Sequence, residues 1–244
     1  MFNSVIEVTF NEGCVYNLDV FSNGPRTNIG KILKNNEEVV DPFLNELIIG
    51  KDEKLKIYFT NPIVSLKKFF SAYYDLNAVY IGSIDFTHFD SSDLIDMSNL
   101  FEGCTSLESV DFTNFDASKV TDMSKMFDHC LNIKSIDLSS FMRPPETHTK
   151  TLNMFDYCFN LVSLDISNIN IQMDFSFLDT KSWSFYSLKY INLYNCGIIS
   201  TYYSSGLYTF LYTFYDSLKR KVAVCLNDDE IDSIKSYDEN IIKY

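Results

Sequence analysis

The sequence predicts an α/β solenoid, in which short repeats stack into a right-handed superhelix of about five rungs between a β-rich N-terminal domain and a helical C-terminal cap. Three observations predict this fold: an apolar pattern that recurs, a near-constant spacing between its copies, and a second motif that lies between them. The corresponding divisions of the chain are residues 1–64, 65–198 and 199–244.

The apolar pattern occurs four times, and its copies follow one another at a nearly regular interval. Its template is apolar-x-x-apolar-x-apolar-x-x-apolar or Cys, seen as LESVDFTNF at 107–115, IKSIDLSSF at 133–141, LVSLDISNI at 161–169 and LKYINLYNC at 188–196. The intervals are 26, 26, 28 and 27 residues along the series Asp85, Asp111, Asp137, Asp165 and Asn192. This template and a period near 27 residues are typical of leucine-rich repeats, whose units span roughly 20–29 residues.

A second motif lies between the expected strands. It reads DMSNLFEGC at 96–104 and DMSKMFDHC at 122–130, and its end recurs as NMFDYC at 153–158. Asp96 and Asp122 each precede a Met-rich turn, and we expect each of them to cap a short helical segment.

These residues carry a family resemblance. The run FTNFDASKVTDMSKMFDHCLNIKSIDLSSF at 112–141 resembles the BspA-like class of leucine-rich repeats, and residues 86–115 match it nearly as well. The likeness covers roughly 76–198 and is interrupted by MRPPETHTK at 142–150. It implies surface adhesion, with binding to an extracellular matrix or to other cells.

Stacked strands place equivalent residues about 4.8 Å apart in columns. Two apolar columns are expected to be buried, Val110/Ile136/Leu164/Ile191 and Phe112/Leu138/Ile166/Leu193. A third column holds Cys104, Cys130 and Cys158, which we expect to be buried free thiols rather than disulfides, because a free cysteine packs as a small apolar residue.

Two exposed groups are the candidate binding residues. Asp85, Asp111, Asp137 and Asp165 form a column on the exposed strand face; it is either a solvated spacer, which we favour, or a stripe that attracts a cation or a basic partner. Tyr194, Tyr202 and Tyr203 belong to a Tyr-rich stretch near the C-terminus, and tyrosine is enriched in protein interfaces. For this stretch we favour an aromatic core of the cap over an interface, but Tyr194 lies between template positions and is expected to be exposed.

The two ends of the chain read differently from the repeats. Short strands are expected at 4–10, 14–21, 46–50 and 54–60, followed by a boundary at Asn61-Pro62 and a first helix at 63–74. At the C-terminus, an amphipathic helix is expected at 203–221, a buried strand at 222–226 and an acidic helix at 227–244.

The net charge and the lack of a recognisable targeting signal indicate which partners and which cellular location to expect. The formal net charge is −13 and the pI is about 4.6, so the surface repels phosphate backbones and nucleic acid is not expected as a partner. No signal peptide and no apolar run of the roughly 20 residues that span a bilayer is found, so membrane insertion is not expected. We expect a chain that is cytoplasmic as synthesised or incorporated in a particle, and the cell surface follows only from the resemblance.

No catalytic or metal-binding pattern emerges. His88, His129 and His148 occupy different repeat positions, and no C-x-x-C pair or catalytic motif occurs, so no enzyme activity, metal or cofactor is expected. The first functional hypothesis is a binding or adhesion module that recognises a protein or glycan. The alternatives are a structural or receptor-binding subunit of a larger multi-protein assembly, such as a virus particle, and a cytoplasmic interaction scaffold.

Overall fold

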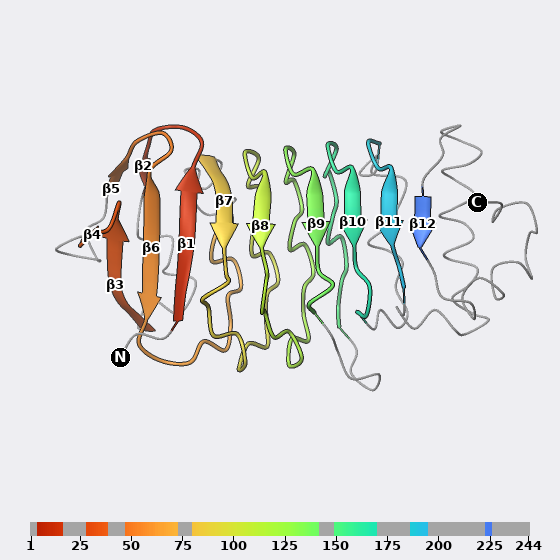
Figure 1. The fold of residues 1–244 in the computed structure, drawn as a ribbon, viewed down its shortest axis with the longest axis horizontal. Coiled ribbons are helices and arrows are strands. Elements are labelled where there is room, and N and C mark those ends of the chain that lie inside the picture. Colours follow the sequence, from red (N-terminus) through yellow and green to blue (C-terminus); the bar gives the residue numbers. More distant parts are fainter. Residues whose placement is uncertain are drawn as a thin grey trace, which may run out of the picture.

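The computed structural model describes residues 4–16, 28–38, 47–72, 80–141, 149–169, 186–194 and 223–225. The strands of the two larger sheets stand side by side in a row along the longest axis of the molecule, whereas β2 and β5 pair with each other in a separate sheet (Figure 1). In chain order they are β1 (Ser4–Phe10), β2 (Cys14–Tyr16), β3 (Ile29–Lys34), β4 (Glu37–Glu38), β5 (Leu47–Ile49), β6 (Lys54–Phe59), β7 (Ile81–Asp85), β8 (Ser109–Asp111), β9 (Ser135–Asp137), β10 (Ser163–Asp165), β11 (Tyr190–Asn192) and β12 (Ala223–Cys225).

The N-terminal strands form an antiparallel layer. β1 alternates buried and half-buried residues, as expected for a strand with one face in the core, and it pairs antiparallel with β6. The strands expected at 4–10 and 54–60 correspond to β1 and β6, and those expected at 14–21 and 46–50 are the shorter β2 and β5. β3 was not predicted; it pairs antiparallel with β6 on the side away from β1.

The N-terminal layer and the first repeats share one sheet. β7 pairs antiparallel with β1 and parallel with β8, which makes a six-stranded sheet in the order β4-β3-β6-β1-β7-β8. Asn11 ties the two parts together, because its Nδ2 donates to the Ser106 carbonyl at 3.1 Å and to Glu108 Oε1 at 3.0 Å. Glycine is required at Gly82, since a Cβ there would overlap the Asn11 side chain.

From β7 onward each repeat, here called a rung, contributes a turn segment and a short parallel strand. The register pairs Ile84 with Val110, and Ile136 with Leu164 and then Ile191. The expected apolar columns are confirmed: every member is buried except Val110, which is partly buried.

The turn segments form a second parallel stack behind the strands. Single bridges join Ser65 to Asp96, Asp96 to Asp122, and Asp122 to Lys150. Between the turns and the strands lies an aromatic column in which neighbouring ring centroids are 6.1, 5.2 and 5.8 Å apart along the series Phe70, Phe101, Phe127 and Phe155. Much of the core is therefore aromatic.

The predicted α/β class is wrong. In the described residues the segments between strands are turns and bends and contain no α-helix, and this includes 63–72, where a first helix was expected. The architecture is therefore all-β in the part of the chain that the structure describes. Among those residues, no helix is long and apolar enough to cross a bilayer.

Backbone geometry explains why the Met-rich turns are not helical. Asp96 does cap its segment, since the Ser98 N–H donates to Asp96 Oδ1 at 2.9 Å. Three residues after the aspartate, however, Asn99 has a φ of 60°, and the equivalent Lys125 has a φ of 56°. A right-handed helix cannot continue through a left-handed residue. The N–H groups instead bond to the next rung, as Phe101 does to the Met126 carbonyl at 2.9 Å.

The predicted helical C-terminal cap is corrected together with the fold class. The described part of 199–244 is strand β12, which pairs parallel with β11 and corresponds to the strand expected at 222–226. The helices expected at 203–221 and 227–244 lie outside the described residues.

The cysteine column is buried and unpaired, as predicted. Cys104, Cys130 and Cys158 are free thiols with 0% exposure. Each Sγ donates to a phenylalanine carbonyl of the preceding rung, at 3.0 Å from Cys104 to Phe70, 3.2 Å from Cys130 to Phe101 and 3.1 Å from Cys158 to Phe127. Burial raises the pKa of the Cys130 and Cys158 thiols, so both stay neutral near pH 7.

Candidate functional site

The outward side chains of β7–β11, together with the residues just after each strand, form a surface that we call the open strand face. Its members repeat from rung to rung in three columns: Ser83/Ser109/Ser135/Ser163, Asp85/Asp111/Asp137/Asp165 and Thr87/Thr113/Ser139, whose next counterpart, Ser167, is buried. In-register pairing places the serine and the aspartate of β7 beside those of β8, and the serine and the aspartate of β9 beside those of β10. The face of β7–β10 is therefore a ladder of carboxylates flanked by hydroxyl groups.

One oxygen of each aspartate holds the turn that follows its strand. Oδ1 accepts from the backbone N–H two residues later, at 2.7 Å for Asp85, 2.9 Å for Asp111, 2.9 Å for Asp137 and 2.9 Å for Asp165. This bond explains why aspartate recurs at the position. Asn192 makes the same bond in β11, to the Tyr194 N–H at 3.0 Å, so the turn requires the oxygen and not the charge.

The other carboxylate oxygen, Oδ2, of the aspartates is the atom that a partner could contact. Asp165 Oδ2 accepts from Asn192 Nδ2 at 2.8 Å. Among the described residues, Oδ2 of Asp111 and Oδ2 of Asp137 accept no hydrogen bond. Both side chains are exposed, so these two oxygens are available to a donor that arrives from solution.

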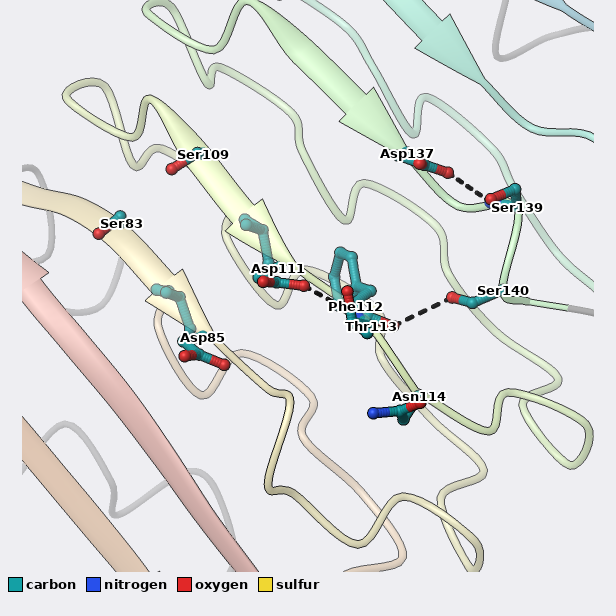
Figure 2. Close-up of a pocket in the computed structure, with 12 residues that line it drawn as sticks. Ser83, Asp85, Ser109, Asp111, Phe112, Thr113, Asn114, Asp137, Ser139 and Ser140 are labelled. Atoms are coloured by element: carbon teal, nitrogen blue, oxygen red, sulfur yellow. Dashed lines mark hydrogen bonds between the residues drawn. The ribbon is translucent and has the colours of Figure 1, made fainter.

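A groove of about 590 Å³ lies over β7, β8 and β9 (Figure 2). Its polar lining comes from all three columns: Ser83, Asp85, Ser109, Asp111, Thr113, Asn114, Asp137, Ser139 and Ser140. Three carboxylates line it, and none of its lining residues is cationic. The groove therefore carries negative charge that its own walls do not neutralise.

The groove coincides with an interruption of the strand ladder. β8 ends the six-stranded sheet and β9 begins a four-stranded sheet in the order β12-β11-β10-β9. On either side of the interruption a backbone bond joins consecutive rungs just after their strands: the Phe86 N–H donates to the Asp111 carbonyl at 2.9 Å, and the Leu138 N–H donates to the Asp165 carbonyl at 2.8 Å. Between the rungs of β8 and β9 a side chain makes the bond instead, since Ser140 Oγ donates to the Phe112 carbonyl at 3.1 Å. The described turn segments behind the groove stay bonded, so the array opens on the strand face alone.

The rung of β11 changes the chemistry of the face. At the position of Ser163, β11 carries Tyr190, which is 37% exposed, and two residues after Asn192 comes Tyr194, which is 48% exposed. Burial, with Cys225 and Asp165 nearby, raises the pKa of Tyr190. An aromatic rung thus follows four rungs of hydroxyl groups and carboxylates.

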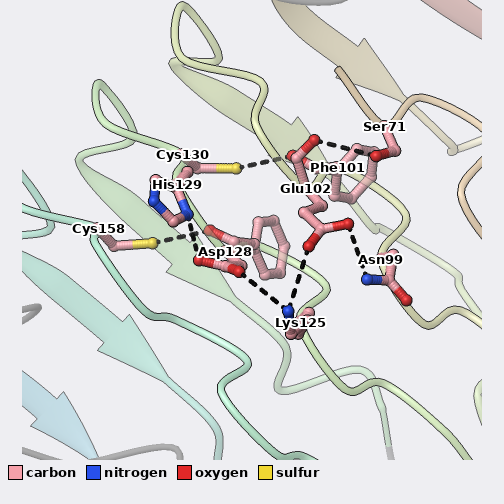
Figure 3. A network of polar contacts seen from close by, with 10 residues as sticks. Ser71, Asn99, Phe101, Glu102, Lys125, Asp128, His129, Cys130 and Cys158 are labelled. Atoms are coloured by element: carbon pink, nitrogen blue, oxygen red, sulfur yellow. Dashed lines mark hydrogen bonds and ion pairs between the residues drawn. The ribbon is translucent and has the colours of Figure 1, made fainter. Parts of the chain in front are cut away.

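A separate polar cluster lies on the turn side (Figure 3). Glu102 and Asp128 are buried carboxylates that share Lys125, at 3.5 and 3.9 Å, and Asp128 Oδ1 also contacts His129 Nδ1 at 2.5 Å. Burial raises the pKa of Asp128, and His129 and Lys125 partly oppose that shift. Because each carboxylate has its partner within the cluster, we assign the cluster a structural role.

The structure brings most of the candidate residues together. Asp85, Asp111, Asp137 and Asp165 form one column, and Tyr194 lies at its far end. Tyr202, Tyr203 and His148 lie outside the described residues. Within the described ranges, no group of three metal-ligating side chains comes together.

Sequence reasoning missed Tyr190 and the groove. Tyr190 could have been found from its place in the template, because it replaces the serine of the earlier rungs. The template carries no signal for the groove, since the rungs on its two sides read alike.

Comparison with known proteins shows a family match. A family model described as "Mycoplasma protein of unknown function, DUF285" matches residues 54–187, more than half of the chain. The matched residues include β6–β10 and the whole groove, whereas β11 and its tyrosines lie beyond them. No curated protein matches the chain.

Proposed function

The chain belongs to the DUF285 family of Mycoplasma proteins, and from that premise we propose that it is a non-enzymatic binding module that recognises a protein partner through the open strand face. The observation that carries the proposal is the groove over β7–β9, in which the carboxylates of Asp111 and Asp137 are exposed and no lining residue is cationic. A lysine or arginine of a partner would supply the missing positive charge.

The resemblance of residues 112–141 to BspA-like leucine-rich repeats supports the same proposal. That resemblance implies adhesion, and the repeated surface offers a partner the same donors and acceptors at several neighbouring rungs. The net charge of −13 favours a basic partner, because opposite net charges speed encounter and steer its orientation.

A protein partner is favoured over a glycan by the kind of groups in the groove. The ring in the lining is Phe112, which is only 4% exposed, so the groove offers no broad aromatic platform on which a sugar ring could stack. What it offers are carboxylate and hydroxyl oxygens, which suit cationic side chains.

The test uses a labelled lysine- and arginine-rich peptide of random order as the probe, titrated with the full chain in a fluorescence anisotropy assay. We expect Asp111→Asn combined with Asp137→Asn to weaken binding about ten-fold, which corresponds to about 0.7 kcal/mol for each lost charge pair. Asparagine keeps the turn, as Asn192 does, so the thermal midpoint should stay unchanged.

The matched control is Asp90→Asn combined with Asp116→Asn. These aspartates also accept from the N–H two residues later, at 3.2 Å from Ser92 and 2.8 Å from Ser118, but they do not line the groove. The control should bind within about two-fold of the unmodified chain. Equal losses in both double variants, or no binding by the unmodified chain, would refute the proposal, and a sugar array then tests the glycan alternative.

A further inference from the structure

We infer that the open strand face takes an extended, arginine-bearing segment of a basic protein, laid across the strands so that one arginine stacks on the tyrosines of β11 while a second basic side chain enters the groove over β8 and β9. This inference rests on the proposed function. It adds the chemistry and the spacing of the partner's residues.

The tyrosines are the first support. Their exposed rings stand at positions that carry small hydroxyl residues one rung earlier, Ser163 for Tyr190 and Ser167 for Tyr194. Tyr190 lies in β11 and Tyr194 follows the strand by two residues, so this rung exposes aromatic rings at positions where the preceding rung carries serines. β11 follows β9 and β10 in the same sheet, and β9 contributes Asp137 to the groove, so one extended partner can reach both.

The neighbouring carboxylate is the second support. Parallel pairing sets Asn192 beside Asp165, whose Oδ2 is 2.8 Å from Asn192 Nδ2. Tyr190 flanks the same carboxylate closely enough to feel its charge. A negative group beside aromatic rings is complementary to a cation with a flat face.

Arginine meets both requirements better than lysine does. The planar guanidinium can stack on a tyrosine ring while its edge donates to a carboxylate. An ammonium group is a compact, strongly hydrated charge and cannot make both contacts in one plane. We therefore expect arginine at the β11 end, whereas either basic residue suits the groove.

The geometry of the array sets the spacing of the two basic residues. β9 and β11 are two paired-strand positions apart, or about 10 Å at roughly 4.8 Å per strand, and the groove extends from β9 away from β11 toward β8, so the basic group in it lies more than about 10 Å from β11. An extended chain advances about 3.3 Å per residue, so about four residues cover that distance. Side chains four residues apart in an extended chain point to the same side, as both contacts require.

The test uses three nine-residue glycine–serine peptides with a fluorescent label. One carries two arginines four positions apart, one carries two arginines three positions apart, and one carries two lysines four positions apart. The unmodified chain should bind the first peptide at least about three-fold more tightly than either of the others.

The matched variant is Tyr190→Ser combined with Tyr194→Ser, which copies the residues of the preceding rung. It should lose about ten-fold in affinity for the first peptide and less than about two-fold for the lysine peptide. An unchanged thermal midpoint and circular dichroism spectrum establish that the variant is folded.

The outcomes separate this inference from the proposed function. If all three peptides bind equally, depend on Asp111 and Asp137, and ignore the tyrosine substitutions, the inference is overturned and the binding face stands. If none of the peptides binds at low salt, both are overturned.

Discussion

Replacing Phe127 by alanine is expected to destabilise the protein by about 4 kcal/mol, a large part of the roughly 5–15 kcal/mol that holds a typical domain folded. Phe127 is fully buried, and its ring lies 5.2 Å from that of Phe101 and 5.8 Å from that of Phe155. Removing the ring leaves a cavity in the aromatic column that joins three rungs, so the loss should appear in urea unfolding as a lower midpoint.

The control for Phe127→Ala is Phe159→Ala, the same substitution at a ring that is 38% exposed. Phe159 makes an edge contact with Tyr157 at 5.8 Å on the surface, so its loss should cost less than about 1.5 kcal/mol. Similar costs for the two substitutions would contradict the assignment of the aromatic column as the core of the repeats.

Raising the pH above about 9 is expected to destabilise the protein steeply through its stacked thiols. Burial holds the pKa of Cys130 and Cys158 above the usual value of 9.0. Above that value the unfolded chain releases protons that the folded chain retains, so the free energy of unfolding falls with pH. The slope is about 1.4 kcal/mol per pH unit for each thiol, or about 2.7 kcal/mol for both, until the folded-state pKa is reached.

The measurement is chemical unfolding at a series of pH values from 7 to 11, in the unmodified chain and in Cys130→Ala combined with Cys158→Ala. Other groups also titrate in this range, and their effects cancel in the comparison. The double variant should start less stable at pH 7, because it loses buried volume, but its stability should fall less steeply above pH 9. Parallel curves would show that the two thiols do not titrate as buried groups.

The columns of the repeat array could be predicted because a fixed period and a fixed register follow directly from the sequence. The template places Leu138 and Ile166 at the same repeat position, and their burial follows from stacking. The aspartate column follows in the same way. The bond from Oδ1 to the N–H of the following turn, which explains the aspartate, is visible only in the structure.

The fold class could not be predicted because the Met-rich motif looks like a helix start. Asp96 and Asp122 do cap their segments, but left-handed residues at Asn99 and Lys125 end them within one turn. Nothing in the residue types marks Lys125 as left-handed, since lysine rarely adopts that conformation. The backbone N–H groups that would bond within a helix instead bond to carbonyls of the next rung, so the turn side also resembles a parallel sheet.

If the open strand face is the binding surface, the peptide carrying two arginines four positions apart should protect that face from amide hydrogen exchange in the full chain. We expect slower exchange at 109–114, 135–140 and 190–194 in the complex than in the free chain, with no change in the turn segments 96–103 and 122–129. Slower exchange confined to the turn segments would mean that the peptide binds elsewhere than on the open strand face.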